Sequence, residues 1–338
     1  MMDAAAAAPS RDFKCHKPVA AFGFPRTMSS HGRGDQTARR RPHEAFMSDD
    51  WHQLYPFSSH AMSIAACRYH YLDEGAGEPL VMVHGNPTWS FYFRNLVLAF
   101  RGRYRVVVPD HLGCGLSDKP QEYPYCLSSH VSNLVRLLAH LDLHNVTLLV
   151  HDWGGAIGLG AALQVPDRVA RLVLFNTGAF PPPFIPWRIR ACRIPWLGTW
   201  AVRRLNLFAR AALRMAVNKP ERMTAAVRAG LLAPYDNWEH RVAIERFVAD
   251  IPASTRHPTW QVLADIERGL PSLANRPVQL IWGMRDWCFR PACLDRFLQL
   301  FPAAETHRLA EASHYVIEDA HEQIIPLVER FLDAHPLP

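Results

Sequence analysis

The chain has 338 residues, of which 49% are hydrophobic, and its formal net charge is +6 at pH 7. That length suits one α/β domain with an insertion, and the apolar fraction is enough for a large core. The positive charge is too small to indicate nucleic-acid binding. The sequence contains no uninterrupted apolar stretch long enough to span a bilayer.

Seven cysteines are scattered along the chain, and no two of them form a CxxC pair. An odd number of dispersed cysteines is typical of reduced thiols in a cytoplasm. The same pattern argues against a disulfide framework and against a zinc site. We therefore expect a cytoplasmic protein that holds no metal ion.

Residues 1–48 have the composition of a disordered tail. This segment opens with an alanine run and then mixes Arg, Ser, Gly, His and Pro without an apolar period. Such a segment cannot bury enough apolar surface to become ordered. It also lacks the apolar stretch of a secretory signal. We predict that the tail is disordered and that Met47 is a candidate for the true start.

After the tail, apolar runs alternate with helical patterns. Two strands are expected between Trp51 and Gly77, and six more at 79–83, 104–110, 146–150, 169–175, 277–282 and 306–309. Helices are expected behind a cap at Ser128 and Ser129, at 154–163, and at the C-terminal end, where Pro326 should disturb the first turns. Strands that alternate with helices indicate a mainly parallel sheet with crossovers.

The strand rhythm stops between Gly178 and about Leu270. We expect a helical cap at 179–270, inserted into a core formed by 49–178 and 271–338. Between Gly178 and Pro220 there is no Asp or Glu, whereas cationic and aromatic residues are frequent, among them Arg188, Arg190, Arg193, Arg203, Arg204, Arg210, Arg214, Lys219, Trp187, Trp196, Trp200 and Phe208. This composition fits either solvated basic helix faces or a peripheral membrane surface for a lipid-derived substrate or an acidic partner.

One stretch has the pattern of a strand, a sharp turn and a helix. An apolar run ends at His151 and Asp152, and Gly154 and Gly155 follow at once. Small residues are needed where strand and helix backbones come close together, as in the nucleophile elbow of α/β-hydrolases. At this turn, free N–H groups and the helix dipole would favour the ionised form of Asp152. The alternative is that Asp152 is only a helix N-cap.

Three more polar residues follow predicted strands. Asn86 comes after the strand at 79–83, Asp286 after the strand at 277–282, and His314 after the last strand. Singly, each is an ordinary turn residue or one of 18 histidines. Together, the chain order of nucleophile, acid and histidine is that of α/β-hydrolase triads. A carboxylate nucleophile suits displacement at carbon, which leaves an ester to be resolved.

On these motifs the sequence resembles the haloalkane dehalogenase branch of the α/β-hydrolases. The resemblance rests on the segments 84–88 (His-Gly-Asn-Pro-Thr) and 151–155 (His-Asp-Trp-Gly-Gly). It implies an α/β-hydrolase fold, that is, a mostly parallel eight-stranded sheet flanked by helices, with an inserted helical cap. It also implies Asp152 as the nucleophile, His314 as the base, and Asp286 as the acid that orients His314.

The same resemblance gives roles to two further residues. Asn86 and Trp153 would supply side-chain N–H donors to a leaving anion, and their backbone N–H groups would form the oxyanion hole. No metal or cofactor is implied. Related chemistries fit less well: an esterase needs Ser at position 152, a fluoroacetate dehalogenase needs Arg at position 153, and an epoxide hydrolase needs two cap tyrosines where Tyr235 stands alone.

Longer segments resemble a subgroup, the β-lactone decarboxylases of bacterial long-chain olefin biosynthesis. These segments are 86–94, 109–120, 176–181, 234–238 and 314–320. The resemblance implies conversion of a long-chain dialkyl β-lactone to a cis-alkene and carbon dioxide, and assembly with the lactone synthetase and reductase of that pathway. Attack by Asp152 at the carbonyl carbon and attack at the alkyl carbon both stay open. So do two other functions, a haloalkane dehalogenase and a ligand-binding protein on a hydrolase scaffold.

Overall fold

The computed structural model describes residues 50–337, so the predicted tail at 1–48 lies outside the described residues. Eight strands form one sheet in the order β1-β2-β4-β3-β5-β6-β7-β8. β1 and β4 each pair antiparallel with β2, and all other neighbours run parallel. The strands are β1 (Ser59–Ile64), β2 (Cys67–Glu74), β3 (Pro79–Val83), β4 (Arg105–Pro109), β5 (Val146–Asp152), β6 (Val169–Thr177), β7 (Val278–Gly283) and β8 (Glu305–Leu309). The mostly parallel, eight-stranded sheet predicted from the sequence is confirmed.

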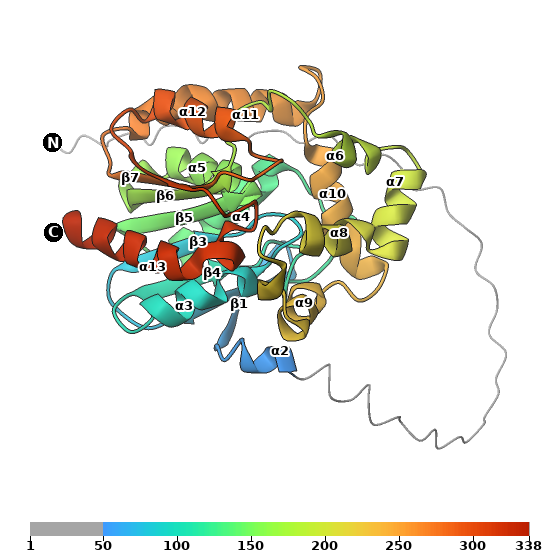
Figure 1. Cartoon of the computed structure of the whole chain (residues 1–338), viewed down its shortest axis with the longest axis horizontal. Coiled ribbons are helices and arrows are strands. Elements are labelled where there is room, and N and C mark those ends of the chain that lie inside the picture. The colour runs from blue at the N-terminus through green and yellow to red at the C-terminus, as the bar shows by residue number, and fades with distance from the viewer. Residues whose placement is uncertain (1–49, 338) are drawn as a thin grey trace, which may run out of the picture.

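Helices cover both faces of the sheet (Figure 1). One apolar cluster joins the sheet to α4 (Leu127–His140), α5 (Trp153–Gln164), α11 (Pro258–Gly269) and α12 (Pro291–Leu300). A second cluster joins its other face to α3 (Arg94–Phe100) and α13 (Val316–Ala334). All seven residues of β5 are buried, as expected for a central parallel strand covered on both faces.

Between β6 and β7 the chain forms helices and no strand. They are α6 (Trp187–Ala191), α7 (Leu197–Thr199), a π-helical turn (Trp200–Arg204), α8 (Leu207–Met215), α9 (Ala225–Leu232), α10 (Val242–Asp250) and α11. The first six lie beyond the end of the sheet (Figure 1). α11 instead packs on α4 and α5 of the core. The boundaries of a cap at 179–270 stay a prediction, and we use the word cap for that range.

The two strands expected between Trp51 and Gly77 are β1 and β2, and Trp51 itself lies in the short helix α2 (Asp50–Gln53). Two local predictions were wrong. α4 begins at Leu127, so Ser128 and Ser129 lie in its first turn rather than at its N-cap. Pro326 lies in the middle of α13, and the non-helical residue of that helix is Ala320, with φ −147°. In the described residues, no helix is both long and apolar enough to cross a membrane.

Candidate active site

The turn from β5 into α5 places Asp152 at the last position of the strand. Asp152 has φ 54° and ψ −128°, a backbone conformation that side-chain-bearing residues rarely adopt. A Cβ atom at Gly154 would lie 2.0 Å from the carbonyl oxygen of Val83, and one at Gly155 would lie 1.8 Å from Oγ1 of Thr177. Only glycine therefore lets the helix start this close to β3 and β6. The Asp152 side chain makes no capping hydrogen bond to α5, which excludes the simple N-cap alternative.

The loop after β3 holds one oxygen of this carboxylate. The backbone N–H of Asn86 donates to Asp152 Oδ1 over 2.8 Å. A Cβ atom at Gly85 would lie 2.0 Å from the same Oδ1, so the room for it depends on the absence of a side chain there. Oδ1 is thus fixed by the backbone, and Oδ2 is left to face the other groups of the site.

His314 lies between two carboxylates. Its Nε2 is 3.5 Å from Asp152 Oδ2, and its Nδ1 is 3.0 Å from Asp286 Oδ2. All three residues are at most 7% exposed. The end of β5 and the loops after β7 and β8 therefore bring together Asp152, Asp286 and His314, the three residues that chain order had placed at strand ends.

Asp286 is itself held by neighbours that sequence reasoning missed. Asn176, near the end of β6, donates from Nδ2 to Asp286 Oδ2 and to the carbonyl oxygen of Gly283, each over 3.0 Å. The backbone N–H of Cys288 donates to Asp286 Oδ1 over 2.6 Å. The available signal was a polar residue near the carboxyl end of an otherwise apolar strand.

A buried neutral histidine supports the backbone of His314. His151 Nε2 bonds the carbonyl oxygen of His314 over 2.8 Å. Burial, reinforced by the charge of His314, lowers the pKa of His151 to about 3. His151 therefore stays uncharged at neutral pH and acts on the site through position.

The electrostatics favour an ion pair at rest. Burial alone would raise the pKa of Asp152, but the hydrogen bond and the charge of His314 outweigh it and lower that pKa. Burial alone would lower the pKa of His314, but the charges of Asp286 and Asp152 and their hydrogen bonds raise it to about 10. At neutral pH the site holds the ionised carboxylate of Asp152 beside the imidazolium of His314.

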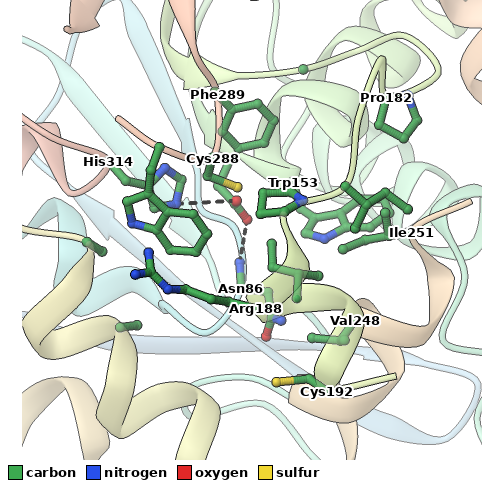
Figure 2. Close-up of a pocket in the computed structure, with 18 of the residues that line it drawn as sticks. Asn86, Trp153, Pro182, Arg188, Cys192, Val248, Ile251, Cys288, Phe289 and His314 are labelled. Carbon is green, nitrogen blue, oxygen red and sulfur yellow. Dashed lines mark hydrogen bonds and ion pairs between the residues drawn. The ribbon is translucent and has the colours of Figure 1, made fainter. Parts of the chain in front are cut away.

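A cavity of about 400 Å³ lies over the ion pair. Its wall is mostly apolar, and Figure 2 shows Trp153, Phe289, Pro182 and Ile251 around the site. The three thiols of the wall belong to Cys192, Cys288 and Cys293. Burial raises the pKa of each, so none supplies a competing thiolate nucleophile.

Only some polar groups of the wall can still bind a ligand. Trp153 Nε1 has no hydrogen-bond partner within residues 50–337, whereas Trp287 Nε1 donates to the carbonyl oxygen of Met215 over 2.7 Å. Asn86 Nδ2 donates one of its two N–H groups to the carbonyl oxygen of Ile244, over 3.3 Å, and its other N–H has no such partner in the described chain. Trp153 and Asn86, which both line the cavity, therefore each keep one side-chain N–H that no group of residues 50–337 binds.

Two further observations restrict the chemistry. Tyr235 is fully buried, and its hydroxyl donates to the carbonyl oxygen of Thr88 over 3.3 Å rather than lining the cavity. It is therefore not placed to protonate an epoxide. Among the described residues, no group of three or more His, Cys, Asp or Glu side chains is arranged to hold a metal ion.

Comparison with known proteins agrees with this geometry. The family model for the alpha/beta hydrolase fold matches residues 78–320. A cis-3-alkyl-4-alkyloxetan-2-one decarboxylase of Xanthomonas campestris pv. campestris is 46% identical, over 79% of this chain and 93% of the relative. Another protein of that name, from Shewanella oneidensis, is 42% identical, over 82% and 89%. Haloalkane dehalogenase 2 of Mycobacterium bovis is 35% identical, over 82% and 96%.

Proposed function

From the premise that this chain belongs to the α/β-hydrolase fold family, we propose that it is a β-lactone decarboxylase. Its substrate would be a long-chain dialkyl β-lactone, and its products a cis-alkene and carbon dioxide, in hydrocarbon biosynthesis. The relatives with the decarboxylase name are 42% and 46% identical, against 35% for the dehalogenase. The observation that carries the proposal is the Asp152–His314 ion pair under a mostly apolar cavity.

We assign Asp152 as the nucleophile, with Oδ2 as the attacking atom, since Oδ1 is held by the N–H of Asn86. Oδ2 attacks the ring carbon that carries the alkyl oxygen. The ring C–O bond breaks, and its oxygen leaves as a carboxylate while the alkyl group is esterified to Asp152. Attack at this carbon, rather than at the carbonyl, uses no water.

The second step releases both products and restores the enzyme. The bond between the carboxylate and its carbon breaks, its electrons form the C=C bond, and the C–O bond to Asp152 breaks. Carbon dioxide and the alkene leave, and no proton is gained or lost overall. The first step inverts the carbon and the second is an anti elimination, so alkyl chains that are cis on the lactone stay cis on the alkene.

In both steps of this reaction His314 acts as a cation. Its raised pKa keeps it protonated at neutral pH, where Nε2 faces the carboxylate that the ring opening releases. Asp286 orients the ring through Nδ1. The free N–H groups of Trp153 and Asn86 stabilise the same anion, each by about 3 kcal/mol if they act as oxyanion donors do.

The alternative is hydrolytic dehalogenation of a haloalkane, which the free donors of Trp153 and Asn86 favour because they could hold a halide. Ester formation would remove the charge of Asp152 and so lower the pKa of His314. His314 would then become the base that activates a water.

One experiment separates the two functions. Purified protein is incubated in heavy-oxygen water with a cis-dialkyl β-lactone or with a bromoalkane, and alkene, bromide and the mass of the Asp152 peptide are measured. Decarboxylation yields alkene and leaves Asp152 unlabelled, whereas hydrolysis yields bromide and labels Asp152. Bromide without alkene would reverse our proposal, and neither product would favour a ligand-binding protein.

The environment of the enzyme is also part of the proposal. We place it in the cytoplasm, in contact with the lactone synthetase and reductase of the same pathway and with a lipid surface. The dispersed cysteines support the cytoplasmic location, and the resemblance to the pathway enzymes supports the contact with the synthetase and the reductase. Co-purification of the three proteins from cells that express them together tests the complex.

A further inference from the structure

Exposed apolar side chains are concentrated on one part of the cap. Of the eight large hydrophobic residues that are exposed in the described chain, seven lie between residues 187 and 207. Trp196 is 83% exposed and Trp187 is 72% exposed, values that a soluble surface rarely tolerates for tryptophan. The other five are Ile194, Leu197, Trp200, Leu205 and Leu207.

The same segment carries cations without counter-ions. Arg188, Arg190, Arg204, Arg210 and Arg214 are exposed, and within residues 50–337 none of them forms an ion pair with a carboxylate. There is no Asp or Glu between residues 178 and 220. We call the seven hydrophobic side chains and these five arginines the cap face.

Apolar and cationic side chains follow one another closely along the cap face. Trp196 directly precedes α7, and Trp200 and Arg204 begin and end the π-helical turn that follows it. Leu207, Arg210 and Arg214 form a stripe on one side of α8, because residues three and four apart are neighbours on a helix surface. Apolar and cationic side chains thus share one outer surface instead of facing opposite sides.

The cap face is continuous with the cavity. Trp187, Arg188 and Leu207 belong to it and also line the cavity over Asp152. α6, α7 and α8, which carry most of the face, lie beyond the end of the sheet, with α7 outermost (Figure 1). Figure 2 shows Arg188 among the residues around the cavity.

We propose that the cap face binds the surface of an anionic phospholipid bilayer and that the substrate passes from the bilayer into the cavity. Tryptophan is enriched at the boundary between headgroups and acyl chains, and arginine pairs with lipid phosphates. Because there is no Asp or Glu between residues 178 and 220, this segment has no negative side chain that an anionic surface would repel. An apolar cavity that opens on this face spares a lipid-derived substrate the passage through water, a point that rests on the proposed function.

Binding is tested first, without turnover. The full chain is floated with vesicles of phosphatidylcholine alone or with phosphatidylglycerol added, at low and at high salt. We expect binding to the anionic vesicles only, weakened by salt. Two variants that leave the cavity lining intact, W196N/W200Q and R204Q/R210Q/R214Q, should each lower the bound fraction at least about tenfold. Asn suits position 196, where φ is 65°.

Matched controls separate the cap face from general surface properties. L98Q removes an exposed leucine outside the cap. R103Q/R268Q/R296Q removes the same charge from exposed arginines elsewhere. Both should bind vesicles as the wild type does. Equal loss in the controls, or no loss in the cap variants, would overturn the proposal.

Turnover then tests delivery. For a long-chain β-lactone carried in anionic vesicles, W196N/W200Q should be at least about tenfold slower than wild type, and for a short soluble β-lactone about equal. Sedimentation equilibrium of the same proteins distinguishes another occupant. A wild-type dimer that W196N/W200Q abolishes would assign the face to a second copy and refute lipid binding. Vesicle binding without lactone turnover would refute the proposed function and leave the membrane surface standing.

Discussion

Two buried aspartates, one at the carboxyl end of the sheet and one in the cap, have pKa values that are shifted in opposite directions. Asp152, at the end of β5, has a cationic partner in His314, and that partner lowers its pKa in spite of burial. Asp250, at the end of α10, accepts hydrogen bonds from the N–H of Leu127 and the hydroxyl of Thr259, but burial dominates and raises its pKa to about 7. Burial alone therefore favours neutral carboxylates, and a reactive anion requires a dedicated partner.

The largest expected difference between the two aspartates is in activity. Asp152→Asn removes the nucleophile and should lower alkene formation at least ~10⁴-fold. Asp250→Asn is the matched change in the cap and should keep the rate within about tenfold, because Asp250 is not among the residues that line the cavity. Rates are measured by gas chromatography of the alkene, and circular dichroism checks the fold. Equal loss in both variants would remove Asp152 from its assigned role.

A second prediction concerns how tightly the turn at the end of β5 is packed. Gly154→Ala would push a Cβ atom against the Val83 carbonyl, which is backbone and cannot rotate away, so unfolding free energy should fall by about 2–4 kcal/mol. Gly102→Ala is the control, since a Cβ atom there meets nothing within 4 Å, and it should change stability by less than about 0.5 kcal/mol. Urea unfolding measures both. Similar losses would show that the elbow is not close-packed.

A smaller effect is expected from the support behind Asp286. Asn176→Ala removes its hydrogen bonds to Asp286 and Gly283, and the rate should fall about 10- to 100-fold through misplacement of the acid. The pKa of His314, about 10 in the intact site, should fall as well, because Asp286 no longer holds its charge in place. Nuclear magnetic resonance titration of His314 measures this. Lost stability with an unchanged pKa would mean that Asn176 is structural only.

The smallest effect is the pH dependence of stability. Since the pKa of Asp250 is raised to about 7 from 3.8, the stability linked to its neutral form is complete below pH 3.8 and is lost as pH rises through about 7. Asp250→Asn should therefore gain about 1–3 kcal/mol on wild type between pH 4 and pH 8. The pKa of Asp152 is lowered, so the stability linked to its ionised form is present at neutral pH and is lost as pH falls. If the unfolding free energies of the two proteins changed with pH in the same way across this range, the raised pKa of Asp250 would be contradicted.

Sequence reasoning located the strands and the candidate triad because both have local signatures. β3 spans the predicted residues Pro79–Val83, and β5 ends at the predicted turn. Contacts between distant segments left no such signature. The N–H of Leu127, at the start of α4, is bound by Asp250 from the cap, and Asn176 on β6 bonds Asp286 in the loop after the neighbouring strand β7. The protonated state of His314 also depends on two carboxylates that meet only in the folded chain.

The bare backbone at Gly85 couples two positions far apart in the chain. The volume that a methyl group would occupy there is filled by Asp152 Oδ1. A nucleophile with a single oxygen, such as serine, would leave that volume empty, and any larger residue at position 85 would evict the carboxylate. Position 85 therefore has to stay glycine for as long as residue 152 is an aspartate in this position.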